Sequence, residues 1–267
     1  MIKKILNIFK SETSIQTMYP ELENVGGLQN AIDIEFKKLN SILRVKIDNE
    51  LDQIPLSYAR IENDEKFSQV YIGANEKLYL PDFWKEGVCL AHGQTKNITD
   101  LGQVINFWLC NEITIRELAN KFKFVIPNDK AFAFEENKEI EYTWNSILQN
   151  ETKEEIHDFI KIAINDNVLN KLFPFTSLYT LCFSRCTGYP YDTYNIPKVT
   201  PKQFENLEPI KDKEFNYKNI NQLERQFIVT VNNEKYLGSG NAVEALKIVK
   251  NNLPENIKPA RKGTSDE

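Results

Sequence analysis

The chain has few of the residues that most often carry metal or redox chemistry. It holds only two histidines, His92 and His157, and four scattered cysteines in 267 residues. These numbers exclude a histidine-rich metal site, and they are too small for a secreted disulfide framework of this length. Only Cys182 and Cys186 are close together, and their spacing is not a standard zinc-ligand pair. The sequence therefore predicts free buried thiols, no metal and no cofactor.

Long apolar runs and basic stretches are also missing. No segment approaches the roughly 18 apolar residues that cross a bilayer. The opening MIKKILNIFKSET lacks the cleavage site of a signal peptide. We expect residues 1–18 to form a short amphipathic segment and the protein to be cytoplasmic. The net charge of −5 disfavours duplex nucleic acid or an anionic membrane as a partner.

The charge is unevenly divided along the chain. Residues 1–150 hold 17 basic and 22 acidic residues, whereas residues 151–267 hold 16 of each. The most acidic stretch is FEENKEIEYTW. Such a run is typical of a solvated helix face, and a docking surface for a basic partner is the alternative.

The usual catalytic motifs are absent as well. The GSGN run at Gly238–Asn241 lacks the lysine of a phosphate-binding loop and the dinucleotide fingerprint, so it predicts a hairpin-to-helix cap. All carboxylates are interpreted as part of polar surface runs, with none embedded in an apolar strand. Cys89 and His92 lie three positions apart on one predicted strand and would face oppositely if that strand were regular. No catalytic residue is therefore predicted.

The patterns that are present predict an α+β fold. Helical spacing covers Leu28–Asn40, and short β-rich runs with polar turns between Ile42 and Gly93 predict an antiparallel meander. Thr99 is expected to cap a helix that covers the apolar face of this meander. We predict an antiparallel sheet covered mainly on one face by helices, in a single domain over residues 19–256. A second lobe formed by the middle helices is the alternative.

The second half continues this mixture. Helical patterns follow Thr114 and cover Tyr142–Gln149 and Lys153–Ile164. The aromatic run LFPFTSLYTLCFSRCTGYPYDTYNIP predicts a core strand that ends in an ordered Gly/Pro loop. The segment Lys198–Gln222 is interpreted as a long connection. A hairpin turning at Asn232 and Asn233 is then followed by a terminal helix, and residues 257–267 are expected to be an extended or mobile tail.

The end of the aromatic strand offers a candidate binding site. Arg185 follows an apolar strand and precedes a loop with Thr187, Tyr189 and Tyr191. A planar cation beside two phenols is typical of binding hot spots, and His92 is included as a further candidate. In the alternative interpretation, Arg185 pairs with a carboxylate and the tyrosines cover the end of the sheet.

Several longer segments carry a family resemblance. The succession AHGQTKNITDLGQVINFWL, TIRELANKFKFV, KLFPFTSLYTLCFSRCTGYPY and NAVEALKIVKNNLPENIKPARKGT resembles a bacterial family of unknown function. Its members are often labelled natural-product biosynthesis proteins. The likeness is expected to run from about Tyr19 to Thr264. The resemblance implies one domain and brings no catalytic residue with it.

Two functions follow as hypotheses. The first is a cytoplasmic bacterial binding or accessory protein, of immunity type, that recognises a protein partner through its surface. The alternative is an enzyme or small-molecule-binding protein of a natural-product biosynthesis cluster. A pocket of about 300 Å³ or more lined by Arg185, Thr187, Tyr189, Tyr191 and His92 favours that alternative, whereas a flat or filled surface disfavours it.

Overall fold

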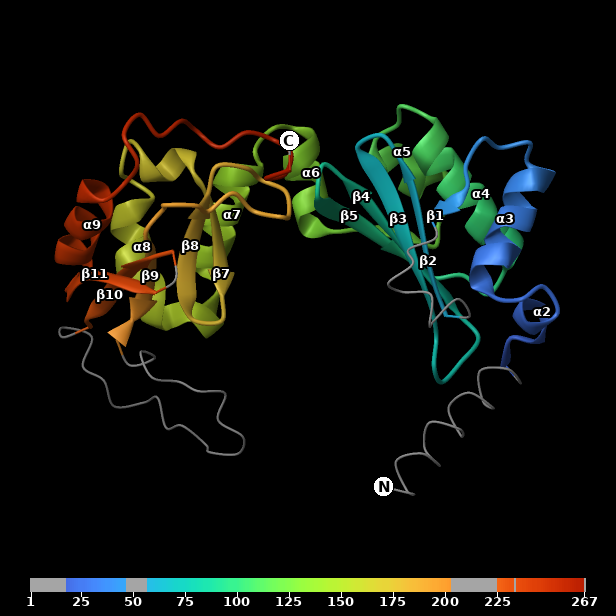
Figure 1. The fold of residues 1–267 in the computed structure, drawn as a ribbon, viewed down its shortest axis with the longest axis horizontal. Coiled ribbons are helices and arrows are strands. Elements are labelled where there is room, and N and C mark those ends of the chain that lie inside the picture. The colour runs from blue at the N-terminus through green and yellow to red at the C-terminus, as the bar shows by residue number, and fades with distance from the viewer. Residues whose placement is uncertain (1–17, 47–56, 203–224, 233, 267) are drawn as a thin grey trace, which may run out of the picture. The chain divides into compact units, whose positions relative to one another are not determined.

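The computed structural model describes residues 18–46, 57–202, 225–232 and 234–266. They form two compact units, one within Met1–Glu135 and one within Glu136–Glu267 (Figure 1). The amphipathic segment predicted over residues 1–18 lies, apart from Met18, outside the described residues. Each unit has its own antiparallel sheet and its own buried apolar cluster.

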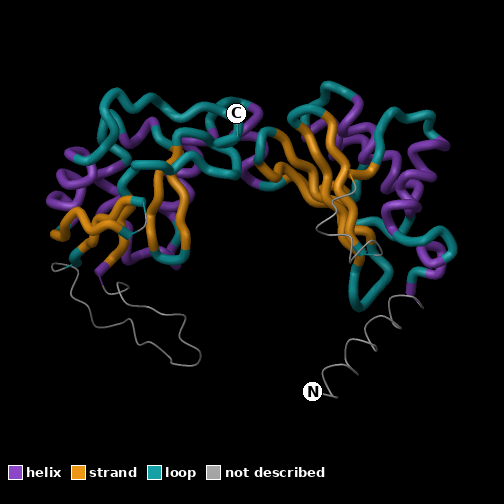
Figure 2. The backbone as a smooth tube through the Cα atoms, viewed as in Figure 1, coloured by secondary structure: helices purple, strands orange, loops and turns teal. Residues whose placement is uncertain are grey.

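The first unit contains the predicted meander. Its sheet has six strands in sequence order, paired antiparallel throughout. The strands are β1 (Val45–Lys46), β2 (Tyr58–Asn63), β3 (Lys66–Ile72), β4 (Tyr79–Lys85), β5 (Val88–Gly93) and β6 (Val125–Pro127). The helices are α2 (Pro20–Glu23), α3 (Leu28–Lys38), α4 (Ile98–Cys110), α5 (Ile115–Lys121) and α6 (Asp129–Glu135). Figure 2 shows α3 and α4 on one side of these strands.

Alternation along the strands explains this layering. Successive side chains of a strand point to opposite faces of the sheet. Ala59 and Ile61 on β2 are fully buried, whereas Arg60 between them is partly exposed. Phe83 on β4 is fully buried and meets the ring of Trp108 on α4 edge-on, with the centroids 6.2 Å apart. The face of the sheet toward α4 is therefore the apolar one.

The cap of α4 differs from the prediction. The helix begins at Ile98, and the side chain of Asn97 accepts a hydrogen bond from the backbone N–H of Thr99 at 2.8 Å. Asn97 is thus the N-cap, and Thr99 is the second residue of the helix. The prediction that Thr99 caps α4 is wrong because asparagine caps as well as threonine does and stands two positions earlier.

The second unit is built around a five-stranded sheet in the order β11-β10-β9-β8-β7. Its strands are β7 (Phe173–Ser177), β8 (Thr180–Ser184), β9 (Lys198–Pro201), β10 (Phe227–Val231) and β11 (Lys235–Gly240). Its helices are α7 (Glu139–Gln149), η1 (Glu151–Ile156), α8 (His157–Ala163), η2 (Leu169–Lys171) and α9 (Ala242–Asn251). Helix α7 packs against β7, and α9 packs against α8, β10 and β11.

Two predictions for this unit are corrected. The aromatic run holds a hairpin, β7 and β8, instead of one strand, because Leu178 adopts a positive φ of 53° and reverses the chain. The segment predicted as a long connection begins with a strand, β9. Val199 at its centre pairs with Leu181 on one side and Val229 on the other. The three residues between Pro197 and Pro201 carry too little local pattern to reveal a strand whose partners are distant in sequence.

The fold class is confirmed. Helices and antiparallel strands together make an α+β protein, with the strands of the first third and of the last quarter in separate sheets. Among the residues that the structure describes, no helix combines the length and the apolar character needed to cross a bilayer.

We expect Gly102→Ala to destabilise the first unit. A Cβ at Gly102 would lie 2.6 Å from the Cβ of Glu35, a buried residue of α3, so the two helices would have to separate. Such overpacking costs about 1–3 kcal/mol, which outweighs the ~1 kcal/mol that alanine gains over glycine in a helix. Urea unfolding measures the change. Gln103→Ala, at the adjacent exposed position, is the matched control, and a G102A variant of increased stability would contradict the predicted close approach.

Candidate functional site

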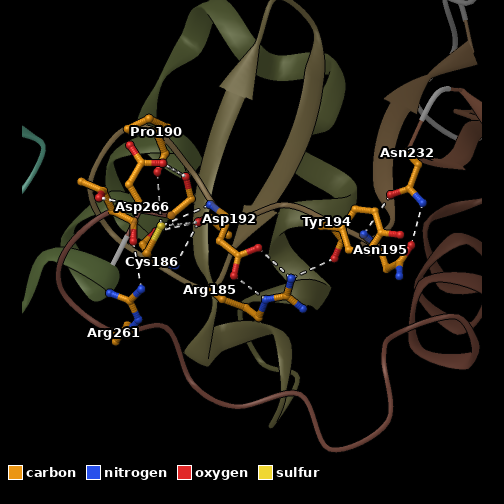
Figure 3. A network of polar contacts seen from close by, with 12 residues as sticks. Arg185, Cys186, Pro190, Asp192, Tyr194, Asn195, Asn232, Arg261 and Asp266 are labelled. Atoms are coloured by element: carbon orange, nitrogen blue, oxygen red, sulfur yellow. Dashed lines mark hydrogen bonds and ion pairs between the residues drawn. The ribbon is translucent and has the colours of Figure 1, made fainter.

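Arg185 lies directly after β8, and its side chain is held by Asp192. The guanidinium donates two hydrogen bonds to the carboxylate, from Nε at 2.8 Å and from Nη2 at 2.7 Å (Figure 3). Nη2 also donates to the backbone oxygen of Tyr194 at 3.0 Å. The planar cation expected to face a ligand is therefore engaged within its own loop.

The next residue, Cys186, anchors the interior of the same loop. It is fully buried, and its sulfur accepts a hydrogen bond from the backbone N–H of Asp192 at 3.2 Å. The hydroxyl of Ser184 donates to the backbone oxygen of Cys186 at 2.7 Å. These contacts make Cys186 a packing and hydrogen-bonding residue of the loop.

The C-terminal segment closes the other side of the loop. The backbone N–H of Arg261 donates to the oxygen of Arg185 at 2.9 Å, and the N–H of Thr187 donates to the oxygen of Arg261 at 3.0 Å. Farther along, the N–H of Ser265 donates to the oxygen of Pro190 at 2.8 Å. In the part of the tail over residues 257–267 that the structure describes, the backbone is thus hydrogen-bonded to the loop at Arg261 and Ser265.

The other predicted site residues of this loop differ in exposure. Thr187 is buried at 3%, and Tyr191 is partly buried, stacking on Phe175 with the ring centroids 4.3 Å apart. Burial raises the pKa of Tyr191 above its usual value. Tyr189 is 68% exposed. Of the tyrosines predicted for the site, Tyr189 therefore presents the larger free surface.

A cavity of about 400 Å³ opens elsewhere in the second unit. Its lining residues are Asn137, Lys138, Ile140, Glu141, Trp144, Ile164, Asn170, Lys171 and Pro259. None of the five predicted site residues is among them. The cavity adjoins the C-terminal segment, because the N–H of Ala260 donates to the backbone oxygen of Lys171 at 2.8 Å.

His92 belongs to the first unit, where its side chain contacts Asp82 and Cys89. It is the register partner of Asp82 across β4 and β5, and its Nδ1 lies 2.7 Å from Asp82 Oδ1. Its Nε2 lies 3.9 Å from the sulfur of Cys89. Because a carboxylate can only accept, Nδ1 carries the proton in this arrangement and Nε2 is left as an acceptor beside the thiol.

A β-bulge brings Cys89 and His92 to one face. The register runs Asp82↔His92 and Phe83↔Ala91 and then shifts to Trp84↔Cys89, so one extra residue of β5 is unpaired. An extra residue reverses the alternation beyond it. The expectation that Cys89 and His92 face oppositely applied to a regular strand. The bulge makes β5 irregular, so the two side chains share one face.

Asp82 is the member of this group that sequence reasoning missed. The sequence patterns predict that every carboxylate lies in a polar surface run. In the structure Pro81 lies within β4, and Asp82 occupies the middle of the apolar strand YLPDFWK. A carboxylate between leucine and two aromatic residues was the available signal, and the prediction that no carboxylate interrupts an apolar strand is wrong.

The three side chains suit either proton transfer or metal binding. Their ligand atoms lie within 4.8 Å of one another, and aspartate, cysteine and histidine are all metal ligands. His92 Nδ1 is hydrogen-bonded to Asp82 Oδ1, and Asp82 keeps its second carboxylate oxygen beside Cys89 Sγ and His92 Nε2, which makes three protein ligands, as in a catalytic zinc site. Burial, aided by the charge of Asp82, raises the pKa of Cys89 to about 11. The resting thiol is therefore protonated.

Comparison with known proteins bears on the second unit. Residues 138–264 match a family of unknown function, DUF6193. The match confirms a resemblance to a family of unknown function, over a shorter span than the Tyr19–Thr264 expected from the sequence. No curated protein and no solved structure matches the chain.

We expect Arg185→Ala to destabilise the second unit by about 1–2 kcal/mol. The carboxylate of Asp192 loses two charge-assisted hydrogen bonds. The loss of stability is modest because solvent screens the two side chains, which are 29% and 33% exposed. The stability of Arg185→Lys should lie between those of the wild type and the alanine variant, because lysine keeps the positive charge but cannot donate two parallel hydrogen bonds to the carboxylate. Urea unfolding measures both. Lys161→Ala, at an exposed ion pair with Asp158, should change stability little, and an R185A variant as stable as wild type would refute the structural role.

The same pair predicts an acid-dependent loss of stability. Arg185 holds the pKa of Asp192 below its usual value by hydrogen bonding and charge. A depressed folded-state pKa contributes stability above the unfolded value of ~3.9, and the contribution disappears as pH falls through the folded value. The stability difference between wild type and Asp192→Asn should therefore be constant above about pH 5 and shrink below about pH 4. Urea unfolding over this range measures it, and a difference that grows on acidification would contradict the assignment.

Proposed function

We propose that the second unit recognises an acidic protein partner through Tyr189 and the basic C-terminal segment beside it. The observation that carries the proposal is the 68% exposure of Tyr189 on a loop whose backbone is fixed from both sides. A large amphipathic ring on a rigid loop loses little conformational entropy when it binds, which is why such residues are frequent interface hot spots.

The cations of the C-terminal segment support an acidic partner. The segment 257–264 contains Lys258, Arg261 and Lys262 and no acidic residue. Lys258 and Arg261 are exposed, and the backbone of Arg261 is hydrogen-bonded to Thr187, two residues before Tyr189. Complementary charge around an aromatic anchor speeds association and fixes the orientation of the partner.

The interior of the loop supports surface recognition over a pocket at these residues. Arg185 is engaged with Asp192 and Tyr194, Thr187 is buried, and Tyr191 stacks on Phe175. These side chains fill the space in which a small ligand would have to sit. A cytoplasmic accessory protein of immunity type remains part of this proposal.

A second candidate function rests on the cavity of about 400 Å³. Ligand sites commonly measure ~300–1,000 Å³ and combine apolar walls with a few polar groups. Here Ile140, Trp144 and Ile164 supply apolar surface, and Lys171 supplies a cation at the rim. A small molecule with an apolar body and an anionic group fits this lining, in keeping with the natural-product link that the resemblance implies. Native mass spectrometry of the protein purified from its own host tests for such a ligand, and Lys171→Glu should abolish its retention.

We expect Tyr189→Ala and Lys258→Glu each to weaken partner binding about tenfold or more without altering the melting temperature, since both side chains are exposed. The tagged chain is cross-linked in its native cells, captured proteins are quantified by mass spectrometry, and affinity for the identified partner is then measured. Tyr236→Ala, 58% exposed on β11, is the matched control and should bind as wild type does. Equal capture by Y189A, or a partner with a basic contact surface, would refute the proposal.

A further inference from the structure

We propose that Cys89, His92 and Asp82 form a thiol–imidazole–carboxylate site that accepts an acyl group on Cys89 from an ester or thioester. The site lies in the first unit, outside the residues that match DUF6193, and it stands independently of the partner-binding surface. What carries the inference is the linear order of the three groups across β4 and β5, together with the β-bulge that creates it.

The hydrogen bonds define a path for one proton. Asp82 accepts from His92 Nδ1 at 2.7 Å and fixes both the tautomer and the orientation of the ring. Nε2 then faces the sulfur of Cys89 at 3.9 Å. A nucleophile beside a base that a third group orients is the recurring geometry of nucleophilic catalysis, and these contacts are often long in the absence of substrate.

Asn128 adds a donor next to the sulfur. Its side-chain Nδ2 donates to the backbone oxygen of Cys89 at 3.0 Å and lies 3.6 Å from Cys89 Sγ. An amide nitrogen carries two hydrogens, so one can hold the backbone while the other faces the region of the thiol. The second hydrogen is donated to Cys89 Sγ, so it stabilises negative charge that develops on the sulfur as the thiol loses its proton.

The surface beside the thiol indicates an apolar acyl group. Trp84 is the register partner of Cys89, so the two side chains share one face of the sheet. Its ring stacks on Phe67, with the centroids 5.1 Å apart and the planes 13° from parallel. A partly exposed pair of stacked rings next to the nucleophile suits a planar aromatic acyl group better than a charged one.

The proposed reaction is hydrolysis of the ester or thioester, with water as the second substrate. Cys89 Sγ forms a bond to the acyl carbon while its proton moves to His92 Nε2. The bond from the acyl carbon to the leaving oxygen or sulfur then breaks, and that atom takes the proton from Nε2. Water next attacks the thioester, gives one proton to Nε2 and releases a carboxylic acid, and the proton returns to Cys89.

The requirement for a base distinguishes Cys89 from another buried cysteine. Burial raises the pKa of Cys182 to about 11 as well, and that thiol has no histidine contact among the described hydrogen bonds. Cys89 is 7% exposed and Cys182 is 9% exposed. The two thiols therefore match in burial and acidity, and they differ in the presence of the His92–Asp82 pair.

The experiment treats the full-length protein with p-nitrophenyl benzoate and maps the acylated cysteines by mass spectrometry over time. We expect Cys89 to be acylated at least tenfold faster than Cys182. His92→Gln and Asp82→Asn should each lower the Cys89 rate about tenfold or more and leave the Cys182 rate unchanged, as loss of a general base or its orienting partner requires. His92 is 56% exposed along its side chain, so its replacement should be tolerated, and near-ultraviolet circular dichroism verifies the fold.

Three results would overturn the proposal. One is acylation of Cys89 no faster than that of Cys182. Another is a Cys89 rate that neither His92→Gln nor Asp82→Asn changes, since a passive thiol would behave in that way. The third is tight binding of Zn²⁺ that requires both Cys89 and His92 and occurs without any acyl intermediate, which would make the group a metal site.

Discussion

Both sheets depend on one constraint: successive side chains of a strand point to opposite faces, and one face must be buried. In the first unit this alternation places Ala59, Ile61 and Phe83 against the helices and leaves Arg60 and Asp82 on the other face. A single extra residue in β5 reverses the alternation locally. The same rule that builds the core thereby brings Cys89 under the imidazole of His92, where a regular strand would have separated them.

In the second unit the polar groups of the loop after β8 hold the loop together. They form hydrogen bonds to one another within a single loop. Arg185 pairs with Asp192, the sulfur of Cys186 accepts from the backbone of Asp192, and the C-terminal segment bonds to the backbone of the loop. A charge that is paired within its own loop holds that loop in one conformation and leaves recognition to the groups on the outer surface of the loop. For this loop the outer groups are the ring of Tyr189 and the nearby cations, which is why the proposed function is assigned to the surface.

The two units thus offer different kinds of chemistry. In the first unit a thiol, an imidazole and a carboxylate contact one another in that order. The second unit has the hydrogen-bonded loop that carries Tyr189 and a cavity with apolar walls. The family match covers the second unit, so the recognition proposal and the acyl-transfer proposal rest on separate parts of the chain. Their experiments can therefore succeed or fail independently.

Local pattern by itself determined much of the fold. Helical spacing gave α3 and α9, alternation and polar turns gave the meander from β2 to β5, and Asn232 marked the last hairpin. These features depend on neighbours within a few residues, which a sequence displays directly. The α+β class follows from them.

Tertiary structure decided the features that depend on distant partners. The strand β9 exists because Val199 pairs with Leu181 and Val229, and the C-terminal segment is fixed because Arg261 meets Arg185. The alignment of Cys89 with His92 arises from one unpaired residue whose presence shows only when β4 and β5 are laid side by side. Strand pairing, register and loop closure join residues far apart in the chain, and no local periodicity records which of them will meet.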